Sequence, residues 1–269
     1  MSYKTNDIQS LPLKGHGRSF MNCHFISFKE EEVGIKKWIK EIVPKLTSIE
    51  EQINTSDYYR RNRTGTSRLF YHLSISKEGF KKLKSTPTTF ETAFEEGMKS
   101  QSRNILLNDI PVDEWEAPFQ KTIDALLIVA DNSERNLTMI QHRLQKSLKD
   151  IGEIVHVEKG NVLRQHGRSV EHFGYVDGIS QPRLVEAGNL NETLLPSILV
   201  EEQPDQFGSY LVFRKLEQHV GRFNRKIKRL SNTLGISEEL AGAQVIGRFK
   251  NGSLLTDNNQ AYNLSLIHI

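Results

Sequence analysis

The sequence is poor in cysteine, with Cys23 as the single thiol among 269 residues. A lone thiol excludes an internal disulfide framework, fits a reducing compartment and is most simply a small core residue. Long apolar runs are also lacking: the longest candidate, Ala125 to Ala130, has six residues, whereas a bilayer span needs about 20. The segment Met1 to Asp7 has no apolar stretch of the kind found in secretory signals. We therefore expect a cytoplasmic protein with no membrane partner.

An excess of charge of one sign is missing as well. The chain has 36 basic and 33 acidic residues, and its formal net charge is +3. This balance lacks the broad positive charge of a nucleic-acid-binding protein, so we expect no nucleic-acid partner. With 37% hydrophobic and 26% charged residues, the composition is that of a globular protein, long enough for one or two domains with buried cores.

Hydrophobic periodicity predicts alternating strands and helices over residues 1–158, the first expected domain. The order strand, helix, strand, strand, helix, strand is that of a ferredoxin-like βαββαβ unit, so the expected fold class is α+β with an antiparallel sheet. An irregular insertion over residues 84–118 precedes the third strand. That strand is continuously apolar, which predicts burial on both faces. The expected strands are 23–28, 69–75, 123–130 and 151–157, and the expected helices are 32–46 and 133–149.

The second part of the chain contains a further expected strand and two expected helices. The strand covers residues 208–216, and the helices cover 217–230 and 237–246. The first of these helices is basic, with Arg222, Arg225, Lys226, Lys228 and Arg229. A run of this kind usually forms a solvated helix face.

The functional prediction depends on residues 171–182, which read EHFGYVDGISQP. This stretch places the carboxylate of Asp177 between Gly174 and Gly178, where the backbone can approach a flat group or take a positive φ. The neighbouring side chains are apolar, so we expect the carboxylate to have little water around it. Such a carboxylate can both take and give a proton near neutral pH. Asp-Gly is also a common turn dipeptide, and the spacing taken alone favours a simple turn.

The complete run from Phe173 to Pro182 resembles the signature of the dye-decolorizing peroxidases, a haem-dependent family with a Gly-x-x-Asp-Gly motif. Gly174, Asp177 and Gly178 match the motif positions one by one. Residues 208–216 and 245–252 resemble the next two blocks of the family, in the same order. Upstream stretches also resemble the family's N-terminal half, so the similarity extends to about residue 263; these stretches are 7–17, 70–79 and 94–109.

The resemblance implies two ferredoxin-like units in tandem, with the haem-binding unit beginning within residues 159–263. It implies haem b as the cofactor, hydrogen peroxide and an aromatic or dye-like donor as substrates, and allows for a homo-oligomer. In the family pattern Asp177 is the catalytic acid/base. The basic helix would then have a second interpretation, contact with the haem propionates. The cofactor contacts implied by the motif are Gly174, Gly178, Ile179 and Ser180.

The resemblance also bears on the end of the chain. In the family, the haem ligand is a histidine beyond the 245–252 block, and His172 belongs to the catalytic side. Residues 264–269 match no family pattern but match one reading frame of a sequencing adapter, so we expect a non-native tail and reject His268 as a ligand. We therefore expect a truncated, inactive fragment of a haem peroxidase, with the axial histidine beyond Ile269. The alternative is a non-enzymatic protein that binds porphyrin for storage or delivery.

Overall fold

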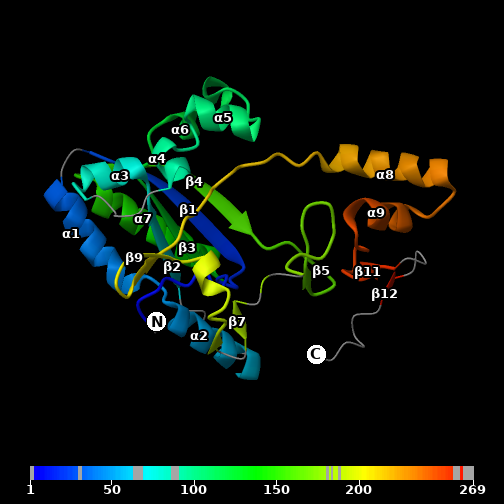
Figure 1. Cartoon of the computed structure of the whole chain (residues 1–269), viewed down its shortest axis with the longest axis horizontal. Coiled ribbons are helices and arrows are strands. Elements are labelled where there is room, and N and C mark those ends of the chain that lie inside the picture. Colours follow the sequence, from blue (N-terminus) through cyan, green and yellow to red (C-terminus); the bar gives the residue numbers. More distant parts are fainter. Residues whose placement is uncertain are drawn as a thin grey trace. The chain divides into compact units, whose positions relative to one another are not determined.

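The computed structural model divides into two compact units (Figure 1). The first unit comprises Met1–Asn161 and Arg183–Leu211, and the second comprises Val162–Pro182 and Val212–Ile269. The first break lies close to the expected boundary at residue 158, but residues 183–211 belong to the first unit. The residues described by the structure are 3–29, 32–62, 69–85, 91–179, 182, 184–186, 189–256 and 261–262.

A four-stranded antiparallel sheet organises the first unit. Its spatial order is β2-β3-β1-β4, so the first strand lies in the middle and pairs with the third and the fourth. Together with α1 (Glu32–Ile42) and α7 (Glu134–Leu148), this order confirms the ferredoxin-like βαββαβ unit and the α+β class. The strands are β1 (Phe20–Phe28), β2 (Phe70–Ile75), β3 (Ala125–Asp131) and β4 (Gly152–Asn161).

The main core lies between one face of the sheet and the two helices. Ile35 and Trp38 from α1 and Leu137 from α7 belong to the same buried cluster as Ile26 and Leu127 of the sheet, so both helices cover one face. Every residue of β3 is buried, which confirms the prediction that this strand is covered on both sides. Alternating strands present only half of their side chains to a core, whereas a continuously apolar strand must be enclosed.

A buried carboxylate connects three elements at one end of this sheet. Asp124, which precedes β3, has no exposed surface. Its Oδ2 accepts a hydrogen bond from the backbone N–H of Phe28 at 2.6 Å and forms an ion pair with the Nζ of Lys82 at 2.8 Å. Lys82 is the last residue of α3 (Lys77–Lys82), which begins where the Ser76 side chain accepts a hydrogen bond from the Gly79 N–H. Asp124 therefore holds the ends of β1, β3 and α3 together.

A second apolar cluster joins the N-terminal segment, α2 (Ile49–Asn62) and the returning segment 184–211. Ile8, Ile49 and Leu195 are buried in it. The packing explains why the returning segment belongs to the first unit. The short elements of this segment are β7 (Val185–Glu186), β8 (Asn189–Leu190), η3 (Leu195–Ser197), β9 (Val200–Gln203) and β10 (Gln206–Gly208), and η1 (Val43–Lys45) extends α1.

The expected irregular insertion before β3 contains several short helices. They are α4 (Thr92–Glu96), α5 (Gln101–Leu107), η2 (Val112–Glu114) and α6 (Ala117–Gln120). Phe119 of α6 contacts the sheet edge-on, with its ring centroid 5.1 Å from that of Phe25. This contact packs the insertion against the sheet.

The second unit contains two helices and short hairpins among its described residues. The helices pack against each other, and both end at glycines in the left-handed region, Gly235 (φ +66°) and Gly247 (φ +85°). Ser237 caps the second helix by accepting the Leu240 N–H at 3.1 Å. These elements are α8 (Val220–Leu234), α9 (Glu238–Ile246), β5 (Arg164–Gln165), β6 (Arg168–Ser169), β11 (Leu254–Leu255) and β12 (Ala261–Tyr262).

The strand expected over residues 208–216 is wrong beyond its first residue. Gly208 ends β10, which pairs with β9 in the first unit, and residues 209–219 form no regular element. A strand requires a neighbour to accept its backbone hydrogen bonds. Within the described residues of the second unit, only two-stranded hairpins are present, and Val212 and Leu216 are left 72% and 71% exposed. No helix in the described part of the chain is long and apolar enough to span a bilayer.

Candidate functional site

The loop that carries Asp177 is fixed by backbone hydrogen bonds to two separate segments. The N–H of Asp177 donates to the Ser169 carbonyl at 3.0 Å, and the N–H of Val176 donates to the Lys250 carbonyl at 3.0 Å. Val170 and Val176 also form an isolated antiparallel bridge. The stretches 169–177 and 249–253 therefore meet within the second unit. The sequence identified both as family blocks without indicating that they touch.

Glu171 organises the same loop through its side chain. Its Oε2 accepts the N–H of Phe173 at 2.7 Å, and its Oε1 accepts the N–H of Tyr175 at 2.8 Å. Its own N–H donates to the Tyr175 carbonyl at 3.0 Å. One carboxylate thus satisfies two backbone donors in a turn that leads directly to Asp177, and such charge-assisted bonds are stronger than neutral ones. Sequence reasoning missed this role, because an acidic residue before a turn has no distinctive pattern.

Asp177 itself is exposed. Its Oδ1 accepts the backbone N–H of Gly178 at 2.7 Å, the local bond typical of an Asp-Gly turn. The expectation that its surroundings contain little water is therefore wrong for the described residues. The reason is that the apolar neighbours pack elsewhere: Val176 and Ile179 lie against Gly252.

The two motif glycines adopt conformations that other residues rarely take. Gly174 has φ +90° and Gly178 has φ +79°. A Cβ built on Gly178 would meet no atom within 4 Å, and one on Gly174 would lie 3.8 Å from the Nζ of Lys250. The backbone at Gly178 is therefore open, whereas Gly174 lies beside the Lys250 side chain; the role of both glycines as cofactor contacts remains a prediction. Ser180, the remaining expected contact, lies outside the described residues.

An aromatic cluster supports the loop from the side of α8. The ring centroids of Phe173 and Phe223 are 4.6 Å apart, and Tyr175 meets Phe223 edge-on at 6.4 Å. Tyr175 is buried, and burial, followed by the nearby charge of Glu171, raises the pKa of its phenol. The Nζ of Lys250 lies 6.0 Å from the centre of the Tyr175 ring.

Close packing at two glycines outside the motif depends on the missing side chain. A Cβ at Gly242 in α9 would lie 2.3 Å from the hydroxyl of Tyr175, and a Cβ at Gly252 would lie 2.3 Å from the Cδ1 of Ile179. Gly252 also has φ +88°. These two glycines allow α9 and the 249–253 segment to approach the loop, which the sequence could not indicate.

Histidines do not gather at this site. His172 is exposed beside the motif, and no group of three or more His, Cys, Asp or Glu residues with metal-binding geometry occurs among the described residues. The expectation that no residue of this chain supplies a metal ligand remains a prediction, because residues 263–269, including His268, lie outside the described part.

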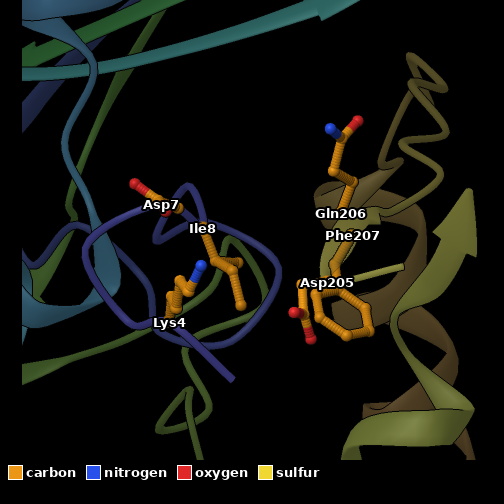
Figure 2. A pocket seen from close by; sticks show the side chains of 6 residues that line it. All are labelled: Lys4, Asp7, Ile8, Asp205, Gln206 and Phe207. Atoms are coloured by element: carbon orange, nitrogen blue, oxygen red, sulfur yellow. The ribbon is translucent and has the colours of Figure 1, made fainter. Parts of the chain in front are cut away.

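The first unit has a separate small pocket of about 260 Å³ (Figure 2). Its lining combines an ammonium group, two carboxylates and one aromatic ring. The ring of Phe207 packs at a tilt against that of Tyr3, with centroids 4.8 Å apart. No residue that the sequence predicted for the site lines it. The lining residues are Lys4, Asp7, Ile8, Asp205, Gln206 and Phe207.

Comparison with known proteins agrees with this architecture. The family model described as the DyP dimeric alpha+beta barrel domain matches residues 7–164. A multifunctional dye peroxidase, DyP2 of Amycolatopsis sp., is 27% identical over 93% of this chain and 58% of its own length. A dye-decolorizing peroxidase of Mycena epipterygia is 26% identical over 92% of this chain and 49% of its own length.

Solved structures of DyP-type peroxidases have the same fold as this chain. The crystal structure of a DyP-type peroxidase from Anabaena sp. superposes with a TM-score of 0.84 and 34% identity, covering 95% of this chain and 59% of the other. The structure of DyP2 from Amycolatopsis sp. gives a TM-score of 0.85 at 26% identity, covering 97% and 60%. The chain thus spans about half to three fifths of the length of these relatives. With the family model covering more than half of its residues, the chain belongs to the dye-decolorizing peroxidase family.

Proposed function

We propose that the protein is a haem-dependent peroxidase that reduces hydrogen peroxide and oxidises aromatic or dye-like donors. The main support is the Asp177 loop, in which a carboxylate stands between two glycines with positive φ and is fixed by main-chain hydrogen bonds to residues 169 and 250. The names of the relatives, which are dye peroxidases, support the same conclusion.

We propose haem b as the cofactor, with Gly174, Gly178, Ile179 and Ser180 as its contacts in this chain. The open space at Gly178 fits a flat macrocycle, because no side-chain atom would block its approach to the backbone. When bound, haem supplies the electrons for peroxide reduction, while the protein supplies binding, orientation and proton transfer.

Asp177 is the proposed acid/base residue. Its Oδ1 is engaged by the Gly178 N–H, which leaves Oδ2 to act on substrate. Oδ2 takes a proton from one oxygen of hydrogen peroxide and returns it to the other oxygen, which leaves as water. A group that is first basic and then acidic must reach both oxygens, and the main-chain bond from Asp177 to Ser169 limits the positions that this side chain can take.

The test begins with haem binding. Haemin is titrated into the chain and, in parallel, into the longest product that its gene encodes, and a shifted Soret band reports binding. Asp177→Asn should then slow the peroxide-dependent change of the Soret band by about 100-fold or more in stopped-flow measurements. Asp205→Asn, which changes an exposed aspartate of the first unit, is the control. An unchanged rate in Asp177→Asn would refute the acid/base role.

The same experiment separates peroxidase catalysis from the alternative function, non-enzymatic binding of porphyrin. A Soret band without peroxide turnover in the longer product would favour porphyrin storage or delivery. Turnover in the longer product and none in the 269-residue chain would agree with our expectation that this fragment is inactive by itself. If neither product binds haem, both proposals are wrong.

A further inference from the structure

Two dipeptides of the second unit place a reactive side chain before a glycine. Asp177-Gly178 is the single Asp-Gly pair of the sequence, and Asn251-Gly252 is its single Asn-Gly pair. In each pair a side-chain carbonyl carbon stands next to the main-chain nitrogen of a residue that has no Cβ to hinder an approach. The nitrogen can attack this carbon and close a five-membered succinimide ring. The motif loop and the segment 249–253 therefore each carry a site where the chain can modify itself.

The Asp177-Gly178 pair is arranged for this ring closure. The Oδ1 of Asp177 lies 2.7 Å from the main-chain nitrogen of Gly178, so the carboxyl carbon bonded to Oδ1 is close to the same nitrogen. Both residues are exposed, and a Cβ at Gly178 would meet no atom within 4 Å. Within the described residues, no main-chain carbonyl accepts the Gly178 N–H. The nucleophile and the carbon that it attacks are therefore adjacent and open to water.

The Asn251-Gly252 pair is held in the opposite way. The Oδ1 of Asn251 accepts the N–H of Ser253 at 2.9 Å and the hydroxyl of the same residue at 2.7 Å. The N–H of Gly252 donates to the Phe249 carbonyl at 2.8 Å, and Gly252 is buried. Three hydrogen bonds must therefore break before the Asn251 side chain can react with the glycine nitrogen. At Gly178 the corresponding hydrogen bond already joins the nitrogen to the carboxyl group that it attacks.

We propose that Asp177 is a site of spontaneous isoaspartate formation in the folded protein, and that the same fold protects Asn251. The Gly178 nitrogen attacks Cγ of the protonated carboxyl group, the nitrogen loses its proton, and one carboxyl oxygen leaves as water. A water molecule then opens the ring at either of its two carbonyls. Opening at the former main-chain carbonyl leaves the chain running through the Asp177 side chain, which is isoaspartate. Water is lost and regained, so the reaction needs no other reactant.

Isoaspartate changes the motif loop in two ways. It inserts one methylene into the main chain between residues 177 and 178, and it attaches the free carboxylate directly to Cα. The carboxylate is then one carbon shorter and leaves the position in which the Gly178 N–H holds it. The loop thereby loses its acid/base group. This consequence for catalysis rests on the proposed role of Asp177, whereas the modification itself does not.

Incubation of the complete chain at physiological temperature and near-neutral pH, without haem or peroxide, tests the inference. One sample stays folded, and a second is unfolded in guanidinium chloride. Labelling by a protein L-isoaspartyl methyltransferase measures the isoaspartate, and peptide mapping with electron-transfer dissociation assigns it to residue 177 or 251. For each site, the rate in the folded chain is divided by the rate in the unfolded chain, which removes the intrinsic difference between aspartate and asparagine.

We expect this ratio to lie within about threefold of one at Asp177, since no hydrogen bond outside the pair holds the two reacting groups. At Asn251 the ratio should be lower by about 100-fold, which corresponds to the loss of three hydrogen bonds. Ser253→Ala removes one of these bonds and should raise the folded-state rate at Asn251 about fivefold without changing the rate at Asp177.

The variant Asp177→Asn gives a matched comparison within one molecule. The chain then contains two Asn-Gly pairs, and both release ammonia when the ring closes. In the folded variant, position 177 should react about 100-fold faster than Asn251, whereas in guanidinium chloride the two rates should agree within about threefold. Asp177→Glu should give no signal at this position, because its ring would need six members. Circular dichroism checks that each variant is folded.

Three results would overturn the inference. They are isoaspartate at residue 177 only in the unfolded chain, equal folded-to-unfolded ratios at the two sites, and equal rates at positions 177 and 251 in folded Asp177→Asn. An unchanged rate at Asn251 in Ser253→Ala would contradict the source of its protection. Because the assay uses neither haem nor peroxide, its failure is distinguishable from a failure of the peroxidase test.

Discussion

Removal of the Glu171 carboxylate should loosen the loop that carries Asp177 while leaving the first unit intact. Glu171→Ala eliminates the two hydrogen bonds to the N–H groups of Phe173 and Tyr175, at 2.7 and 2.8 Å. Hydrogen bonds to a charged group contribute about 1.5–3 kcal/mol each when shielded. Glu171 is half-buried, so we take about 1.4–2.8 kcal/mol for both hydrogen bonds together. This corresponds to an increase of about 10- to 100-fold in local opening.

Amide hydrogen exchange measures this opening directly. The amides of Phe173 and Tyr175 should exchange about 10- to 100-fold faster in Glu171→Ala, since exchange follows the free energy of local opening. Glu171→Gln keeps one acceptor oxygen and should show a smaller increase. The control is Glu217→Ala, whose side chain is 82% exposed. Exchange of the Tyr175 amide within about twofold of the wild type in Glu171→Ala would refute the reasoning.

Three further predictions concern the buried groups and the close packing. Asp124→Ala leaves the Lys82 ammonium and a backbone N–H without their partner and should lower the free energy of unfolding by about 3–5 kcal/mol; an unchanged urea midpoint would contradict this. Burial lowers the pKa of His24 from 6.5 to about 4. The contribution of its neutral side chain to the free energy of unfolding is therefore complete above pH 6.5 and is lost as the pH falls toward 4. His24→Asn should therefore show a flatter decline of the thermal midpoint between pH 7 and 4.5 than the wild type, and identical declines would count against the idea. Gly242→Ala puts a Cβ 2.3 Å from the Tyr175 hydroxyl and should destabilise the second unit by about 1–3 kcal/mol, whereas an unchanged melting transition would show that Tyr175 moves without cost.

The fold of the first unit could be predicted because its patterns are local and strong. The continuously apolar run before Asp131 identified β3, and its burial on every residue follows from that run. The helical spacing of Leu137, Ile140, Leu144 and Leu148 identified α7. Three of these residues are buried, and Ile140 is partly buried against the same core. In both cases the side-chain pattern alone determines which surface must be covered.

The errors arise where the outcome depends on partners distant in sequence. Residues 208–216 have the composition of a strand, but a strand forms only alongside another strand, and in the described structure the residues from 209 to 216 belong to no strand. The return of residues 183–211 to the first unit depends on contacts such as those among Leu195, Ile8 and Ile49. Periodicity within a segment contains no information on such contacts.

The motif residues of the candidate site could be recognised in the sequence, whereas their geometry could not, and their roles remain predictions. Asp177 and its two glycines were recognisable from the extended motif, and the positive φ of both glycines agrees with it. The exposure of Asp177 could not be inferred, because apolar neighbours in sequence pack in whichever direction the tertiary structure provides. The contact between Val176 and Lys250 joins residues 74 positions apart, beyond the reach of any local pattern.

The strand order of the first unit has a consequence for synthesis on the ribosome. The first strand, β1, pairs with β3 and β4, and β2 pairs with β3 across the long connection of residues 76–124, so no tight hairpin joins successive strands of this sheet. While the nascent chain is shorter than about Ala125, neither β1 nor β2 has a sheet neighbour to bind. All pairings of this sheet are therefore non-local, which slows folding, and the apolar side chains of β1 remain available to chaperones until β3 has emerged.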